Sequence, residues 1–328
     1  GVEKGEKVLE EIDRVPDFWP DVDTVRTDLL DYAFEIEHFD AHLMQMLLLL
    51  EEAGELDNTL VVVTADNGMP FPRVKGQVYE YSNHLPLAIM WPEGIRNPGR
   101  VVDDFVSFID FAPTFLEVAG VDLQQSGMQE MEGRSLTEIF ASGKSGQVVE
   151  ERDFVLVGKE RHDLGRPDDQ GYPVRGIVKG DWLYLNNYHP ERWPAGNPET
   201  GYLNCDGGAT KSFILNQRRI FGNREFWDLN FGKRVPEELY NIKEDPCCLN
   251  NLAEDPEYMQ HLEDLKGEMT RKLEAQADPR ILGRGEVFMT YPYAQSNRGL
   301  YEKIMAGEEV NTGWVNASDF EPEWVEKP

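Results

Sequence analysis

Hydrophobic residues recur every three or four positions over residues 25–53, and this spacing predicts a long amphipathic helix. The polar cluster 21–24 offers an N-cap for this helix, and Gly54 is the residue expected to end it. Two apolar runs follow, residues 59–65 and 85–91, which predict two strands with a polar loop between them. The pattern therefore indicates a helix, a strand, a loop and a second strand.

The next part of the chain alternates short elements with turns. Residues 101–108 predict a short strand, residues 109–120 a helix, and residues 136–141 another short helix. Residues 143–147 read GKSGQ, a flexible composition that suits a boundary between domains. We therefore expect residues 1–145 to belong to one domain and residues 146–328 to a second.

The pattern changes beyond this boundary. Three short runs rich in β-branched and aromatic residues, 153–158, 173–178 and 182–187, predict an antiparallel meander, and residues 238–240 predict a last short strand. Residues 256–277 then predict an amphipathic helix. Its apolar face is expected to consist of Met259, Leu262, Leu265, Met269 and Leu273.

Composition narrows the class of protein. The 328 residues are 40% hydrophobic and 28% charged, as in a soluble globular protein, and no apolar run is long enough for a membrane helix. The net charge of −29 argues against partners such as nucleic acid or an anionic membrane. An anionic substrate would need a local cationic pocket, because the net negative charge of the protein repels it. The three cysteines form neither a disulfide framework nor a metal-ligand pattern.

The strongest chemical candidates follow the first predicted strand. Asp66 and Asn67 stand where that strand ends, and in an open α/β sheet ligands bind at this edge. Carboxylate and amide oxygens suit a hard cation such as Ca²⁺ or Mg²⁺, and Lys75, nine positions later, could hold an oxyanion. The alternative is an ordinary turn, because Asp-Asn-Gly is a common turn sequence.

Basic residues also gather between the predicted strands of the second domain. Arg161, His162 and Arg166 lie in the polar loop 158–175 and could contact an anionic substrate; a solvated loop with local ion pairs is the alternative. Arg192 is a further cationic candidate, and it precedes Trp193, which suits either a platform for a sugar ring or a packed loop anchor.

His38 and His42 lie four residues apart on the long predicted helix. That spacing can bind a metal, but without an acidic partner motif we interpret them as surface histidines.

Five segments in order resemble the C-terminal part of a type I sulfatase of the alkaline-phosphatase superfamily. They are LLLLEEAGELDNTLVVVTADNG, PLAIMWP, FVSFIDFAPTFLEVAG, GRSL and ELYNIKEDPCCLNNLAEDP, within residues 22–277. The run DNGMPFP followed by Lys75 is similar to the heparan N-sulfatase (sulfamidase) branch and its bacterial relatives. The resemblance implies an α/β fold, with part of a central sheet flanked by helices and a smaller antiparallel-sheet subdomain.

The resemblance also implies roles for residues. Asp66 and Asn67 would be ligands of Ca²⁺, rather than Mg²⁺, and Lys75 would bind a sulfate oxygen, although Arg73 is close enough to take that role. His162 and Arg161 would lie in the substrate pocket. The family's nucleophile is a formylglycine made in a C/S-x-P-x-R motif, and none of the three cysteines is in one. Because the polar residues 1–23 resemble a linker, we expect the nucleophile upstream of this chain and expect the chain alone to be inactive.

The expected function is hydrolysis of a sulfate ester or sulfamate on a sulfated carbohydrate. Two alternatives are a phosphodiesterase or phosphonate hydrolase of the same superfamily, and a non-catalytic protein that binds sulfated glycans. The bacterial members of the family are mostly exported, which implies a periplasmic or secreted protein. The sequence does not determine the sugar, the sulfated position or the oligomeric state.

Overall fold

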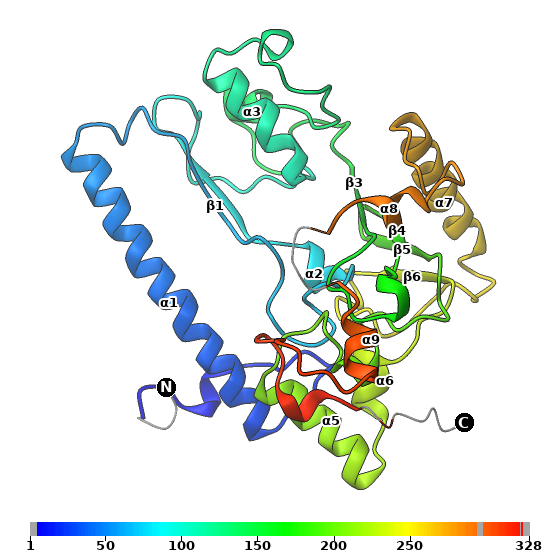
Figure 1. Ribbon diagram of the computed structural model, residues 1–328. Helices are drawn as coiled ribbons and strands as arrows, with labels where there is room; N and C mark the ends of the chain where they lie inside the picture. Colours follow the sequence, from blue (N-terminus) through cyan, green and yellow to red (C-terminus); the bar gives the residue numbers. More distant parts are fainter. Residues whose placement is uncertain (1–4, 294–297, 322, 324–328) are drawn as a thin grey trace.

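The computed structural model describes residues 5–293, 298–321 and 323 of the chain (Figure 1). Its helices are α1 (Asp23–Glu52), α2 (Glu80–Asn83), α3 (Phe111–Val118), α4 (Thr137–Ala141), α5 (Ala209–Phe221), α6 (Glu225–Phe231), α7 (Met259–Ala275), α8 (Val287–Thr290) and α9 (Leu300–Met305). Its strands are β1 (Val61–Thr64), β2 (Leu87–Met90), β3 (Phe154–Lys159), β4 (Val174–Lys179), β5 (Trp182–Asn187) and β6 (Glu237–Asn241). No helix in the described ranges has the length and apolar character needed to cross a membrane.

Helix α1 confirms the long helix predicted from periodicity. Its end was also predicted correctly, because Gly54 adopts a φ of 70° and the Glu55 amide donates to the Leu50 carbonyl, the pattern of a Schellman cap. Its start differs from the prediction, since the N-cap is Val22 and no side chain caps the helix. The first turn is closed by backbone alone, because the amides of Val25 and Arg26 both donate to the Val22 carbonyl at 3.0 Å.

Strands β1 and β2 pair antiparallel, from Val61 opposite Met90 to Thr64 opposite Leu87. The strand expected at 101–108 is wrong, because only an isolated bridge between Val102 and Gly146 forms there among the described residues. The carboxylate of buried Asp104 instead accepts hydrogen bonds from the amides of residues 148 and 149. A side chain thus supplies the pairing that a neighbouring strand would have given.

The predicted meander is confirmed as β3, β4 and β5, and the predicted last strand, β6, pairs with β5 to complete a four-stranded antiparallel sheet. Helix α7 packs on one face of it through Leu262, Leu265, Met269 and Leu273. Met259 is 57% exposed, so its assignment to the buried face was wrong. Residues 188–236 leave the sheet between β5 and β6 and form helices α5 and α6, which hydrophobic periodicity had not indicated.

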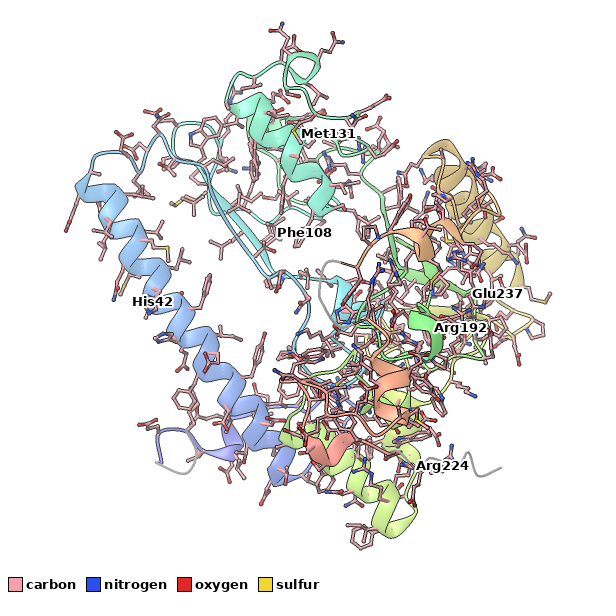
Figure 2. All side chains as sticks on the ribbon, in the orientation of Figure 1. His42, Phe108, Met131, Arg192, Arg224 and Glu237 are labelled. Carbon is pink, nitrogen blue, oxygen red and sulfur yellow. The ribbon has the colours of Figure 1, made fainter. Side chains whose placement is uncertain are left out.

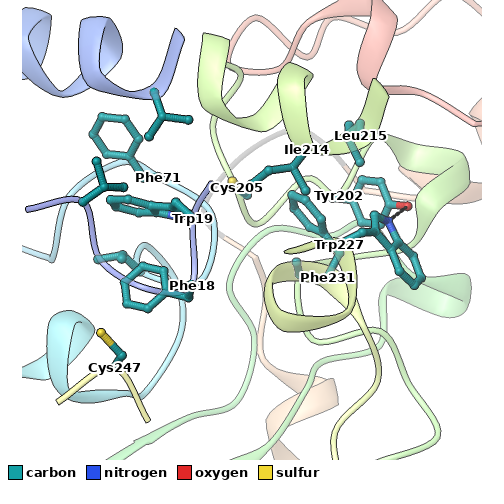
Figure 3. Close-up of a cluster of buried hydrophobic side chains, with 14 of the residues drawn as sticks. Phe18, Trp19, Phe71, Tyr202, Cys205, Ile214, Leu215, Trp227, Phe231 and Cys247 are labelled. Carbon is teal, nitrogen blue, oxygen red and sulfur yellow. Dashed lines mark hydrogen bonds between the residues drawn. The ribbon is translucent and has the colours of Figure 1, made fainter. Parts of the chain in front are cut away.

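The largest core cluster joins segments that are far apart in the sequence (Figure 3). Phe18 and Trp19 lie in it, so the interpretation of residues 1–23 as a polar linker was wrong for this part. The Trp19 indole donates to the Pro72 carbonyl at 3.0 Å, while the Trp227 indole donates to the Tyr202 hydroxyl at 3.1 Å. The N-terminal segment therefore anchors the loop that follows β1.

Candidate functional site

The loop between β1 and α2 carries the first group of candidate residues. Asp66 and Asn67 are both exposed and directly follow the strand, as predicted. The Asn67 side-chain nitrogen donates to the Gly68 carbonyl at 2.9 Å, which leaves its amide oxygen for another partner. A Cβ at Gly68 would lie 2.5 Å from the Tyr81 carbonyl oxygen, so only glycine lets the loop pack this closely on α2.

Lys75 lies further along the same loop and makes an ion pair with Asp206. Its ammonium nitrogen is 2.6 Å from a carboxylate oxygen of Asp206, and each side chain is 25% exposed. Sequence reasoning missed Asp206 because it lies 131 residues away on the irregular segment before α5. Only the fold brings these two side chains together.

His162 comes from the loop after β3 and lies against the residue that follows Lys75. Gly76 has a φ of 69°, and a Cβ there would lie 3.1 Å from His162 Nδ1 and 3.1 Å from the Asn204 carbonyl oxygen. Nδ1 is buried, and it lies 3.1 Å from the Asp163 carboxylate without hydrogen-bond geometry. The structure thus brings His162 to the loop that carries Lys75.

Lys159, the last residue of β3, also holds the loop that carries Lys75, and the sequence analysis did not select it. Its ammonium donates to the Gly76 carbonyl at 2.6 Å and to the Pro194 carbonyl at 3.2 Å. Burial lowers the pKa of Lys159 well below its usual value, and the nearby positive charge of Arg166 adds to this effect. Its position after a run of β-branched residues was the only sequence signal available.

Two of the cations proposed to contact substrate lie inside the protein. Arg73 is 5% exposed, donates to the carbonyls of Leu229 and Cys248, and lies 4.2 Å from the centre of the Tyr79 ring. Arg166 is 1% exposed and donates to the carbonyls of residues 193 and 194. Burial lowers the pKa of Arg166 to about 10. Both guanidinium groups are occupied in holding backbone.

The other two arginines are partly exposed and also contact backbone. Arg161 donates to the Tyr291 carbonyl at 2.7 Å, and Arg192 donates to the Gly171 carbonyl at 3.0 Å. Trp193 is 8% exposed, with its ring centre 5.9 Å from that of Trp227. This packing favours a loop anchor over a platform for a sugar ring.

The histidine pair on α1 lies apart from these residues. His38 and His42 are exposed, with their Nε2 atoms 3.1 Å apart, and His42 projects from the middle of α1 (Figure 2). Over the described part of the chain, no group of three or more histidine, cysteine, aspartate or glutamate side chains could hold a metal. The pair therefore fits the interpretation as surface histidines.

Comparison with known proteins shows what this chain is similar to. Residues 6–121 match the sulfatase family, a range that contains Asp66, Asn67 and Lys75. An ulvan-active sulfatase of Formosa agariphila is 27% identical over 83% of this chain and 42% of its own length. The human N-sulphoglucosamine sulphohydrolase is 28% identical over 78% of this chain and 50% of its own length. The human N-acetylglucosamine-6-sulfatase is 39% identical over 64% of this chain and 35% of its own length.

Solved structures agree on the fold. A structure from a study of glycosaminoglycan metabolism by Bacteroides thetaiotaomicron has a TM-score of 0.57 at 19% identity, over 89% of this chain and 52% of that one. The sulfatase-like protein yidJ of Bacteroides fragilis has a TM-score of 0.56 at 16% identity, over 86% of this chain and 50% of that one. The chain spans half or less of the length of the curated relatives named above. Its similarity to sulfatases therefore extends well beyond the residues 6–121 that match the family.

Proposed function

We propose that the enzyme containing this chain hydrolyses a sulfate ester or sulfamate on a carbohydrate. One observation carries the proposal: the loop that follows β1 presents Asp66, Asn67 and Lys75 within the part of the chain that matches the sulfatase family. The same loop contacts His162, which lies against Gly76. An oxygen-donor pair, a lysine and a histidine on one loop junction suit the binding of a sulfate group.

Lys75 is the cation that we assign to the sulfate. Its side chain is partly exposed and its partner is a carboxylate, whereas Arg73 is buried and bonded to two carbonyls. An ammonium placed at a sulfate oxygen stabilises the negative charge that grows there in the transition state. Arg73 and Arg166 then support the loops, and His162, Arg161 and Arg192 remain the substrate-facing candidates of this half of the site.

Asp66 and Asn67 fit a share of a calcium site. Both are exposed at the strand end, and they offer a carboxylate and an amide oxygen, the hard donors that Ca²⁺ prefers over six to eight positions. Two donors are too few for a complete site, so the remaining ligands belong to other residues of the enzyme. The chemistry that such a cation supplies is polarisation of the sulfate and activation of the nucleophile, which we place with the formylglycine outside this chain.

The relatives indicate the class of substrate. By name they act on ulvan, on N-sulphoglucosamine and on N-acetylglucosamine-6-sulfate, which are all sulfated carbohydrates. We therefore propose a sulfated glycan as substrate, with a glucosamine-type residue first among those to test. One relative is described as an extracellular sulfatase, which supports a periplasmic or secreted location.

The test is sulfate release by the enzyme encoded by the complete reading frame. The substrates are N-sulfoglucosamine, N-acetylglucosamine-6-sulfate and ulvan oligosaccharides. A phosphonate monoester and a phosphodiester are assayed in parallel as alternative substrates. We expect turnover of a sulfated sugar, turnover lowered by about 100-fold or more in Asp66→Ala and in Lys75→Ala, and recovery after chelation on adding Ca²⁺ in preference to Mg²⁺. Faster turnover of either phosphorus substrate would assign the alternative hydrolase, and binding without turnover would assign the glycan-binding protein.

A further inference from the structure

Lys75 differs from Arg73, Lys159 and Arg166 in the kind of group to which it donates. Arg73, Lys159 and Arg166 all donate to backbone carbonyls, whereas the Lys75 ammonium lies 2.6 Å from the carboxylate of Asp206. Both members of the pair are 25% exposed, so solvent and ligands can reach them. A lysine side chain has a flexible four-carbon stem, and a fixed partner is what holds its charge at one point.

The segment that carries Asp206 is itself firmly held. Lys211 is fully buried on α5 and donates to the carbonyls of Gly201 at 2.8 Å and Cys205 at 2.7 Å. The Lys211 ammonium also lies 3.2 Å from the carboxylate of Asp319, which is equally buried. One charged side chain therefore fixes the backbone on the N-terminal side of Asp206.

The C-terminal tail and α1 hold the same segment from two further directions. The Trp314 indole donates to the Leu203 carbonyl at 2.9 Å, and the Gly207 amide donates to the Trp314 carbonyl at 2.7 Å. Asp28 of α1 accepts hydrogen bonds from the Thr210 amide at 2.8 Å and the Thr210 hydroxyl at 2.6 Å, and so caps α5. Asp206 is thus presented by backbone that three parts of the chain immobilise.

We propose that Asp206 is a positioning residue for Lys75 in the reaction of the proposed function, on which this inference rests. An ammonium group has three N–H donors. With one of them on Asp206, the other two are free to bind oxygens of the sulfate, and the charge is in place before the substrate arrives. Preorganised charge of this kind needs no rearrangement during the reaction. The carboxylate acts through Lys75 and does not react.

The ion pair of Lys75 and Asp206 should affect substrate binding and turnover differently. The Asp206 carboxylate offsets the attraction of Lys75 for the sulfate in the ground state, yet it holds the ammonium where the transition state needs it. Its removal should therefore lower kcat without raising KM. A residue with only a structural role would instead lower the folded fraction and leave both constants of the folded enzyme unchanged.

The test is a double-mutant cycle of Asp206→Asn and Lys75→Met in the complete enzyme, with N-sulfoglucosamine as the substrate. We expect Asp206→Asn alone to lower kcat by about 10-fold or more, since a small misplacement of a catalytic group can cost about 100-fold. In the Lys75→Met background the same change should alter kcat by less than about twofold, because residues that act as one unit are not additive. Asp206→Glu, which keeps the charge, should retain more activity than Asp206→Asn.

Asp31→Asn is the matched control. Asp31 is exposed and lines the same 260 Å³ hollow as Asp206, beside α1 and the start of α5. The Asp31→Asn substitution removes one negative charge, as Asp206→Asn does, but it leaves the Lys75–Asp206 pair intact. Both kcat and KM should therefore stay within about twofold of wild type.

The outcomes separate this inference from the proposed function. An active wild type in which Asp206→Asn lowers kcat equally with and without Lys75, or has no effect on kcat, overturns the positioning role alone. A wild type that releases no sulfate from any sulfated sugar overturns the proposed function and, with it, this role. If Asp206→Asn does not fold, as judged by its circular dichroism, the comparison of Asp206→Glu with wild type in the two Lys75 backgrounds decides the matter.

Discussion

The ammonium of Lys211 lies 3.2 Å from the carboxylate of Asp319, and neither side chain is exposed to solvent. The pair joins α5 to the short helical turn of residues 317–319 near the end of the chain. Because Lys211 also donates to the carbonyls of Gly201 and Cys205, the pair links the C-terminal tail to the segment that presents Asp206. The buried pair thus helps to hold the segment that carries Asp206.

Removal of one partner of this buried pair should destabilise the protein strongly. We expect Asp319→Ala to lower the free energy of unfolding by about 3–5 kcal/mol, because it leaves the buried Lys211 charge uncompensated. Urea denaturation followed by tryptophan fluorescence measures this change. The control is Asp181→Ala, which breaks the exposed pair of Lys243 and Asp181, with side chains 68% and 55% exposed, and should cost at most about 1 kcal/mol. Equal costs for the two variants would contradict the prediction.

Replacement of Lys75 should change the kinetics, whereas replacement of Arg73 should change the stability of the fold. Lys75→Ala should lower kcat/KM by about 100-fold or more with little effect on unfolding, as for loss of one charge-stabilising donor. Arg73→Ala should lower the free energy of unfolding by about 1–3 kcal/mol, because it leaves the buried Cys248 carbonyl without its side-chain donor, whereas the Leu229 carbonyl still accepts from Arg234 at 2.8 Å. Steady-state kinetics and denaturation of both variants check this. A stable Arg73→Ala variant with a raised KM would instead show that Arg73 binds the substrate.

The cysteines should be unreactive until the protein unfolds. Burial raises the pKa of the Cys205 thiol to about 12, and burial also raises that of Cys248 to about 12. We expect neither to be alkylated by iodoacetamide at neutral pH in the native state, and both to be alkylated in urea, because the thiolate is the reactive form. Mass spectrometry of tryptic peptides reads the sites. Rapid labelling of Cys205 in the native enzyme would contradict the burial shown here.

The same thiols make stability sensitive to alkali. An unfolded thiol loses its proton near about pH 8.5, whereas the folded thiols keep theirs to higher pH, so the unfolded state binds fewer protons above that value. Stability should therefore be unaffected by these groups below about pH 8.5 and fall above it, on the order of 1 kcal/mol per pH unit for each thiol. Urea denaturation at a series of pH values from neutral to about pH 10 measures the slope, and Cys205→Ala should make it shallower.

A sample consisting of residues 1–328 alone should be prone to association. Phe39, Met46 and Leu49 on the outer half of α1 are 49%, 56% and 65% exposed, and α1 extends beside the two-stranded sheet of β1 and β2 (Figure 1). Exposed apolar side chains that lie together and unpaired strand edges both favour aggregation. We expect such a sample to bind a hydrophobic dye and elute as aggregates in size-exclusion chromatography. A monodisperse sample with one cooperative melting transition would contradict this.

Local patterns were enough to predict the regular elements. The three-and-four spacing of apolar residues in α1 and α7, and the glycine at position 54, specify helices and a helix end through backbone geometry alone. The short β-branched runs likewise identify β3, β4 and β5, because each of them pairs with the strand next to it along the chain. The same kind of reasoning failed for residues 101–108, where the Asp104 carboxylate pairs with backbone that lies 44 and 45 residues away.

Local sequence was enough to select the types of residue at the candidate site, whereas the partners of these residues depend on the tertiary structure. Asp66, Asn67 and Lys75 could be selected because they follow a strand within one loop, where chemistry and spacing are both local. Arg73 is two residues from Lys75, yet it lies in the core, while Lys75 meets Asp206 at the surface. Whether a cation is buried against carbonyls or left for a ligand depends on what packs over it. Those packing segments come from residues more than a hundred positions away, and no local pattern contains them.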